Sequence, residues 1–318
     1  MKIGFQFPGT DGSTLGYGKF QNIPDFGAPY CAVMLGSLMT ATPGTNLFAG
    51  LSGAAGNATV LGAPSTNGLS LGGAVITASI ASGVLNVSTF SSGTPLAVGN
   101  EIYFGGVYYG TISSLGTGTG GTGTYNMSGS TNVSSSTLVS CAANVKFPGT
   151  PRTLFNTTSA VTLFGVAKVA AAQEILGDYT GNNPSMSLLA PTGSAGGSQA
   201  YGNDGAANAN STTNGPDNNN ATTWSFFAGI FTSTTAQAFH QRTATGRYAS
   251  TAATKASGAI GSTTNVLQSG RPYGNVAPSG NVAVLGAYTK ALSLTANGEM
   301  DQLFAACVGL MTDIGETL

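Results

Sequence analysis

Short runs rich in valine, isoleucine, threonine, tyrosine and phenylalanine recur along the whole chain, and glycine, asparagine, serine or proline ends each of them. Side chains that are aromatic or branched at Cβ favour strands, whereas the residues that end the runs favour turns. The clearest runs are 162–169, 223–232 and 281–288. The pattern predicts an all-β protein built from short antiparallel strands.

The run 223–232 carries large apolar side chains on both of its faces. Alternate residues of a strand point to opposite sides, so Trp224, Phe226 and Ile230 share one side. Phe227 and Phe231 share the other side. A strand that is apolar on both faces lies between two packed layers, which favours a sandwich over an open sheet. We interpret Trp224 as a buried anchor rather than as a sugar-stacking residue.

One helix is predicted, near the end of the chain. Apolar residues recur there at steps of three and four, the spacing of a single buried stripe on a helix. They are Met300, Leu303, Phe304, Cys307, Leu310 and Met311. Thr295 or Asn297 is expected to cap the first turn. Glu299 and Asp301 suit the positive end of the helix dipole.

Residues 75–140 form a compositional unit of their own. The segment holds one charged residue, Glu101, and alternates strand and turn patterns throughout. Ser82 and Gly83 suit a hairpin turn between 76–80 and 84–87. We therefore expect 1–74 and 141–318 to be the two parts of one sandwich, with 75–140 as a small β domain inserted between them.

Charged side chains are scarce, which excludes several functions. Lysine, arginine, aspartate and glutamate make up 7% of the 318 residues, and the formal net charge is -1. A chain without a basic field does not neutralise phosphates, so nucleic-acid binding is not expected. No apolar run reaches the roughly 18 residues of a membrane-spanning helix, so membrane insertion is not expected. No secretory signal segment is recognised.

The residues that most often bind metals or perform catalysis are few and scattered. His240 is the only histidine, and Cys31, Cys141 and Cys307 are far apart in sequence. This spacing does not support a zinc site, and neither a metal nor another cofactor is predicted. An odd number of cysteines fits a reducing compartment, so we expect three buried thiols. His240 is interpreted as a structural histidine, either hydrogen-bonded or exposed.

The segments that flank the insert together resemble the concanavalin A-like, laminin-G-like jelly-roll family. The stretch 46–73 resembles the opening of such domains, and the runs 162–169, 224–231 and 238–249 follow in the order of the family's central strands. The most specific match is 281–304, a last strand followed by a short turn and a helix. The resemblance implies a concanavalin A-like jelly-roll sandwich.

The insert has a resemblance of its own. Its stretch LAVGNEIYFGGVYYGTISSLGTGTGGTGTY, residues 96–125, is similar to small β modules of bacteriophage structural proteins. This resemblance implies a virion protein of a fibre, a tail or a capsid decoration, assembled in the host cytoplasm. Its partners would be other virion proteins and further copies of itself, with a trimer expected for a fibre-like element.

Jelly-roll proteins that bind sugars or calcium present carboxylates and amides on loops, and two regions of this chain offer such side chains. The candidate ligand-binding residues come from the long polar stretch 194–220 and from the Gly/Pro-rich loop near residue 271. The adjacent pair Asp178 and Tyr179 is added to them. They are Asp178, Tyr179, Tyr201, Asn203, Asp204, Asp217, Arg271 and Tyr273. Calcium takes six to eight oxygen ligands, and two carboxylates in the stretch are too few. A polar surface or a subunit-contact loop is the alternative interpretation.

Two classes of function follow. The first is a non-enzymatic virion structural protein, whose weakly charged surfaces are easily desolvated in symmetric interfaces and which also contacts host-surface glycans. The second is a carbohydrate-binding adhesin, a lectin-like receptor-binding protein. A glycan-cleaving enzyme would need two carboxylates that face each other across the scissile bond. The acids form no obvious pair, so an enzyme is not expected.

Overall fold

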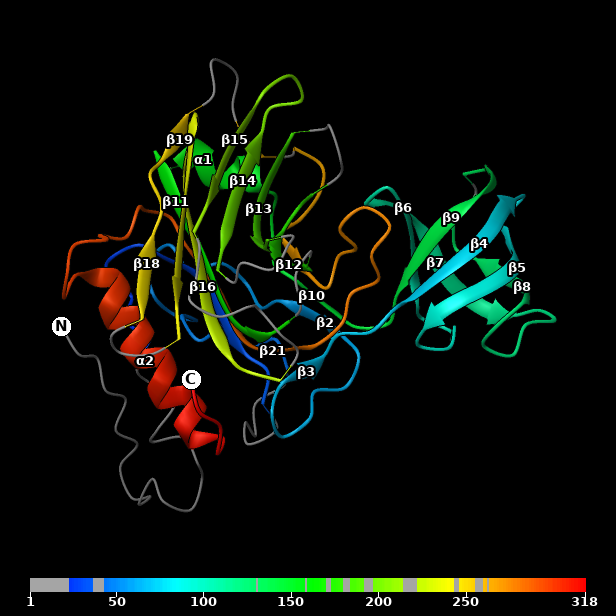
Figure 1. The fold of residues 1–318 in the computed structure, drawn as a ribbon, viewed down its shortest axis with the longest axis horizontal. Helices are drawn as coiled ribbons and strands as arrows, with labels where there is room; N and C mark the ends of the chain where they lie inside the picture. The colour runs from blue at the N-terminus through cyan, green and yellow to red at the C-terminus, as the bar shows by residue number, and fades with distance from the viewer. Residues whose placement is uncertain are drawn as a thin grey trace.

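The computed structural model describes residues 23–36, 43–129, 131–157, 159–169, 173–179, 184–191, 197–213, 222–242, 246–254, 260–261 and 263–318. Two sheets pack face to face, and a six-stranded barrel stands beside them (Figure 1). The C-terminal helix lies on the far side of the sandwich from the barrel. The predicted all-β sandwich with an inserted small β domain and a C-terminal helix is confirmed.

One layer of the sandwich is an eight-stranded sheet. Its main path runs β1 (Pro29–Met34), β21 (Asn281–Tyr288), β11 (Ala160–Lys168), β16 (Ser225–Thr232), β17 (Thr235–Gln241) and β18 (Arg247–Ala249). The short strands β3 (Leu69–Ser70) and β19 (Ala253–Thr254) pair with β21 and β17. The three clearest runs of the sequence are thus the neighbouring strands β21, β11 and β16 of this sheet, paired antiparallel.

The other layer is a seven-stranded sheet. Its order is β15 (Asn208–Thr212), β14 (Gln199–Asn203), β13 (Ser185–Ala190), β12 (Gln173–Gly177), β20 (Gln268–Ser269), β10 (Asn144–Lys146) and β2 (Thr59–Leu61). The interpretation of 194–220 as one polar loop is wrong, because the stretch contains the β14–β15 hairpin at the sheet edge. The face of this hairpin that packs on the core has room only for small residues, because a Cβ on Gly202 would stand 2.3 Å from Ile260 Cδ1.

Strand β16 is buried on both faces, as predicted. Phe227 and Phe231 pack in the cluster between the two sheets, whereas Phe226 and Ile230 pack under the C-terminal helix. That helix, α2 (Glu299–Asp313), buries all six residues of the predicted stripe. Trp224 is 2% exposed and its Nε1 donates a hydrogen bond to Glu316 at 2.7 Å. The interpretation of this tryptophan as a buried anchor is confirmed.

Two details of the helix prediction are wrong. The N-cap is Gly298, which has no side chain, and neither Thr295 nor Asn297 caps the helix. Asp301 Oδ2 instead accepts the Asn297 N–H at 2.7 Å, so a carboxylate of the first turn braces the chain ahead of the helix. A second helix, α1 (Pro151–Thr157), was not predicted, because seven residues are too few to show a helical period.

The inserted unit is a closed barrel with its own core. Its strands are β4 (Ala74–Ala81), β5 (Val84–Gly93), β6 (Glu101–Phe104), β7 (Val107–Leu115), β8 (Gly123–Met127) and β9 (Val133–Cys141), closed in the order β4-β5-β8-β7-β6-β9. Ser82 and Gly83 form the predicted hairpin turn, with φ of 51° and 76°. Positive φ at both central residues is the requirement of a type I′ turn.

The chain enters and leaves the barrel at neighbouring points. The Ala142 N–H donates to the Gly72 carbonyl at 2.7 Å, and the Ala74 N–H donates to Ser140 Oγ at 2.8 Å.

We predict that replacing residues 75–140 by a short Gly/Ser bridge leaves a folded sandwich, because both chain ends are already in place. Cooperative thermal unfolding followed by circular dichroism checks this. Loss of cooperative unfolding would contradict the division into 1–74, 75–140 and 141–318, which stays a prediction.

The rare residues are buried. Cys31, Cys141 and Cys307 are free thiols inside the protein, as predicted, and burial raises the pKa of Cys31 and Cys141 to about 12. His240 is buried, but neither ring nitrogen has a hydrogen-bond partner among the described residues. Within the same part of the chain, no helix has the length and apolarity to cross a membrane, and no group of three or more His, Cys, Asp or Glu could hold a metal ion.

Candidate functional site

All three candidate tyrosines lie together on the outer face of the seven-stranded sheet. Tyr201 lies on β14, Tyr179 follows β12, and Tyr273 lies in the loop after β20. Ring centroids are 4.6 Å apart for Tyr179 and Tyr273, and 5.7 Å apart for Tyr179 and Tyr201. All three side chains are half-buried. We call Tyr179, Tyr201 and Tyr273 the tyrosine cluster.

The tyrosine cluster is continuous with a row of amides. Gln199, Tyr201 and Asn203 alternate along β14, so their side chains share one face. Asn203 Nδ2 donates to the Tyr201 hydroxyl at 2.9 Å, and Gln199 Nε2 donates to Asn210 Oδ1 at 2.8 Å. Asn210 stands opposite Tyr201 on the edge strand β15. The exposed part of this face therefore combines aromatic rings with neutral hydrogen-bonding groups.

Two of the three predicted carboxylates, Asp178 and Asp204, have local structural partners. Asp178 is buried, and its Oδ1 accepts the Met186 N–H at 2.5 Å. Asp204 Oδ1 accepts the N–H groups of Ala206 and Ala207 at 2.8 and 2.7 Å, which shapes the turn between β14 and β15. Asp217 lies outside the described residues. Of the eight candidates, the structure thus brings together Tyr179, Tyr201, Asn203 and Tyr273.

A buried glutamate supports the tyrosine cluster from below, and sequence analysis did not find it. Glu174 on β12 accepts hydrogen bonds at Oε1 from Ser187 Oγ at 2.7 Å and from the Tyr179 N–H at 3.1 Å. Burial raises the pKa of Glu174 to about 7, and the positive charge of Arg271 and these hydrogen bonds oppose the rise. The carboxyl fixes the backbone that carries Tyr179. The available signal was a glutamate directly before the apolar pair Ile175 and Leu176.

Arg271, predicted to contact a ligand, is buried where the barrel meets the sandwich. It is 4% exposed. Its Nη1 donates to the Gly106 carbonyl of the barrel at 3.4 Å, and its Nη2 donates to Gln268 Oε1 at 3.5 Å. The guanidinium stands 5.9 Å from the Tyr103 ring, and Nε lies 3.9 Å from Glu174 Oε2. Arg271 therefore contacts both units of the fold.

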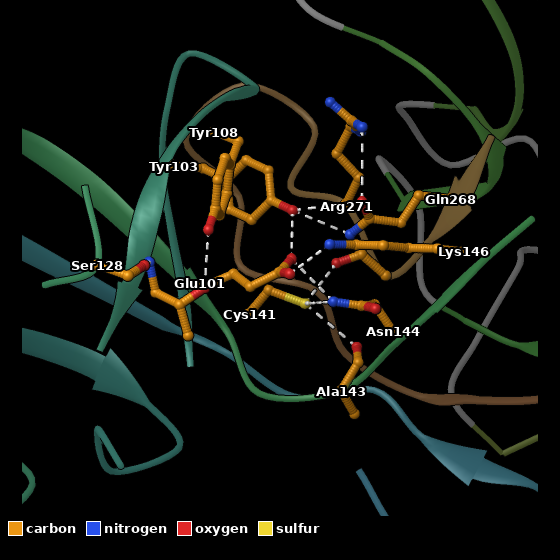
Figure 2. A network of polar contacts seen from close by, with 12 residues as sticks. Glu101, Tyr103, Tyr108, Ser128, Cys141, Ala143, Asn144, Lys146, Gln268 and Arg271 are labelled. Carbon is orange, nitrogen blue, oxygen red and sulfur yellow. Dashed lines mark hydrogen bonds and ion pairs between the residues drawn. The ribbon is translucent and has the colours of Figure 1, made fainter. Parts of the chain in front are cut away.

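Further polar contacts surround Arg271 at this boundary (Figure 2). Glu101 Oε2 accepts hydrogen bonds from the Tyr103 hydroxyl at 2.6 Å and from Asn144 Nδ2 at 2.9 Å, and its Oε1 pairs with Lys146. Gln268 Nε2 donates to the Tyr103 hydroxyl at 3.0 Å. The junction network consists of Glu101, Tyr103, Asn144, Lys146, Gln268 and Arg271. It joins strand β6 of the barrel to strands β10 and β20 of the sandwich.

Comparisons with solved structures found similarities at low sequence identity. Domain 4 of a GH43 extracellular arabinanase from Geobacillus stearothermophilus, in complex with arabinotriose, is 11% identical with a TM-score of 0.34, over 52% of this chain and 73% of that chain. The LG1-3 region of the laminin alpha2 chain is 8% identical with a TM-score of 0.32, over 81% of this chain and 64% of that chain.

Domains LG4-5 of the mouse laminin alpha1 chain are 9% identical with a TM-score of 0.29, over 85% of this chain and 90% of that chain. No protein-family model matches the chain, and a search of curated proteins found no match. The class of the protein, an all-β sandwich with an inserted barrel, rests on the strand order of its own sheets.

Proposed function

We propose that this protein binds a glycan at the tyrosine cluster and has no enzymatic activity. The observation that carries the proposal is the meeting of three half-buried tyrosines beside a row of amides. A tyrosine ring offers a broad apolar surface with a polar tip, which suits the apolar face of a sugar ring. The amides of Gln199 and Asn210 can donate and accept hydrogen bonds, which suits sugar hydroxyls.

The chemistry of this face favours an uncharged glycan. The side chains that accompany the tyrosine cluster on β14 and β15 are amides and hydroxyls: Gln199, Asn203, Asn208, Asn210 and Thr212. Arg271, which precedes Tyr273 by two residues, is buried and contacts the barrel at Gly106. Binding without ion pairs is little affected by salt. We therefore expect the affinity to stay nearly constant between low and physiological ionic strength.

The carboxylates near the tyrosine cluster accept hydrogen bonds from neighbouring groups, which supports the proposal that the protein has no enzymatic activity. Glycoside hydrolysis uses two carboxyl groups that flank the scissile bond. Glu174 is fully buried and accepts hydrogen bonds from Ser187 and Tyr179. Asp178 and Asp204 accept backbone N–H groups. In these positions the carboxyl groups accept local hydrogen bonds, which supports a structural role for them.

Replacing a ring of the tyrosine cluster should weaken glycan binding. An array of neutral and acidic oligosaccharides selects the probe, and calorimetric titration then gives its affinity. Tyr201→Ala and Tyr273→Ala are each expected to lower the affinity at least about tenfold, about 1.4 kcal/mol, because ring contact area is lost. Tyr109→Ala, which removes a half-buried tyrosine of the barrel strand β7, serves as the matched control and should leave the affinity unchanged. Equal effects of all three substitutions would contradict the site.

A second proposed function is that of a structural protein of a bacteriophage virion, in a fibre, a tail or a capsid decoration. The surface of the barrel supports an assembly role. Glu101, its single charged residue, is buried. Among the residues that the structure describes, five of the six exposed large apolar side chains belong to the barrel: Val98, Phe104, Val107, Tyr108 and Leu115. A surface with few charges and many apolar side chains favours association.

The assembly proposal predicts an oligomer made of copies of this chain, with a trimer expected. Light scattering coupled to size-exclusion chromatography measures the mass of the protein in dilute solution. A mass of three chains of 31.5 kDa supports the proposal. A monomer at all concentrations, with no copy of the chain found by mass spectrometry in purified phage particles, would contradict it and leave the glycan-binding protein as the proposed function.

A further inference from the structure

We infer that Arg271 is a positioning residue that couples the seating of the inserted barrel to the arrangement of the tyrosine cluster. The inference rests on the proposed function, since it concerns the same glycan site. Arg271 is the residue of the junction network that also faces the glutamate below Tyr179. The coupling therefore runs from the barrel, through one guanidinium, to the site on the sandwich.

The barrel side of this connection is the tip of the β6–β7 hairpin. The carbonyl of Gly106 in that tip accepts a hydrogen bond from Arg271 Nη1, and the Tyr103 ring of β6 stands next to the guanidinium. Arginine is suited to this place because its planar guanidinium donates in several directions and stacks on aromatic rings. A barrel displaced from the sandwich would remove both contacts from a buried charge.

The sandwich side begins at Glu174. Its Oε2 has no hydrogen-bond partner among the described residues and lies 3.9 Å from Arg271 Nε. Its Oε1 holds the Tyr179 N–H at 3.1 Å. Tyr273 follows Arg271 by two residues and packs on Tyr179 with ring centroids 4.6 Å apart. A shift of Arg271 therefore reaches two rings of the tyrosine cluster, one through Glu174 and one through the backbone.

Burial gives this connection its strength. Removing one member of a buried ion pair leaves an uncompensated charge, which is strongly destabilising. Glu174 and Arg271 are both almost completely buried. If the guanidinium turns toward water after the barrel loosens, Glu174 loses its counter-ion and the backbone of Tyr179 loses its fixed partner. The two units thus favour each other's native arrangement.

Hydrogen exchange of the full-length protein, measured by mass spectrometry, tests the coupling directly. In Arg271→Met, exchange should become faster at the amide of Tyr179 and also in the hairpin peptide 104–108. A role confined to one unit would change one of the two regions only. Arg271→Lys keeps the positive charge, so its exchange rates in both regions should lie between those of the wild type and Arg271→Met. Tyr125→Phe, which removes the hydroxyl of a barrel tyrosine that bonds Gly120 and Gly121 and takes no part in the junction network, is the matched control and should leave the exchange at Tyr179 unchanged.

Affinity for the oligosaccharide selected on the array gives the second readout. Arg271→Met should lower it at least tenfold, with partial recovery in Arg271→Lys. If Arg271→Met does not fold, the double variant Glu174→Gln/Arg271→Met, which buries no unpaired charge, must show faster exchange in both regions. Unchanged exchange in either region would overturn the inference. If the wild-type protein binds no oligosaccharide, the proposed function fails, and the exchange pattern alone then decides whether Arg271 couples the two units.

Discussion

Phe226→Ala is expected to lower the free energy of unfolding by about 4 kcal/mol. Phe226 is completely buried under α2, in the middle of an aromatic group. Its ring centroid lies 6.3, 6.1 and 5.8 Å from those of Phe164, Phe239 and Phe304. The truncation removes these contacts and leaves a cavity between the eight-stranded sheet and the helix. Urea unfolding of the wild type and the variant measures the loss.

The matched control for this prediction is Phe104→Ala. Phe104 is 39% exposed on the barrel, so the same truncation creates no enclosed cavity. Its cost should stay below about 1 kcal/mol, in the range of surface substitutions. Similar losses for the two variants would contradict the description of the helix as a cover that completes the core of the sandwich.

His240→Leu should become more stable relative to the wild type by about 4 kcal/mol as the pH falls from 7 to 3. His240 is buried against Phe227, and burial, with a smaller effect of the Arg242 charge, lowers its pKa from 6.5 to about 3. Below pH 6.5 the unfolded wild type gains a proton at this histidine that the folded protein does not gain. Wild-type stability is therefore lost as the pH falls from 6.5 toward 3. Leucine does not titrate, so the variant escapes this loss.

Urea unfolding at several pH values from 7 to 3 measures that difference. The other titrating groups are the same in both proteins and cancel in the comparison, including Glu174, whose raised pKa acts in the opposite direction. A carboxyl with a folded-state pKa of about 7 lowers the free energy of unfolding of the protein as the pH rises from 4.5 to 7. A difference between wild type and variant that is independent of pH would show that His240 takes up its proton in the folded state.

The sandwich and its helix could be predicted from the sequence because their signals are local. The two apolar faces of 223–232 correspond to the cluster between the sheets and the cluster under the helix. The spacing of apolar residues from Met300 to Met311 gave the buried side of α2. In both elements the spacing of apolar residues, every second residue in the strand and every third or fourth in the helix, indicates which side is buried. Because burial of these sides decides the fold, the fold could be predicted.

The glycan site could be predicted only in part, because its signals are weak or distant. Strands β14 (QAYGN) and β15 (NANST) consist mainly of small and amide residues, many of which favour turns, and Thr212 is their one β-branched residue, so the sequence did not mark them as strands. The site was found through its tyrosines and Asn203. The junction network joins positions up to 165 residues apart, such as Tyr103 and Gln268. No pattern along the sequence brings such residues together.

Nuclear magnetic resonance of protein labelled at its 11 tyrosine rings tests the central claim most directly. Single Tyr→Phe variants assign the signals, and the selected neutral oligosaccharide is then titrated into the wild type. The structure predicts that the ring signals of Tyr179, Tyr201 and Tyr273 shift together along one binding curve, while those of the barrel tyrosines Tyr109 and Tyr125 stay in place. Saturable binding that shifts other tyrosines and leaves these three unchanged would contradict the proposed site.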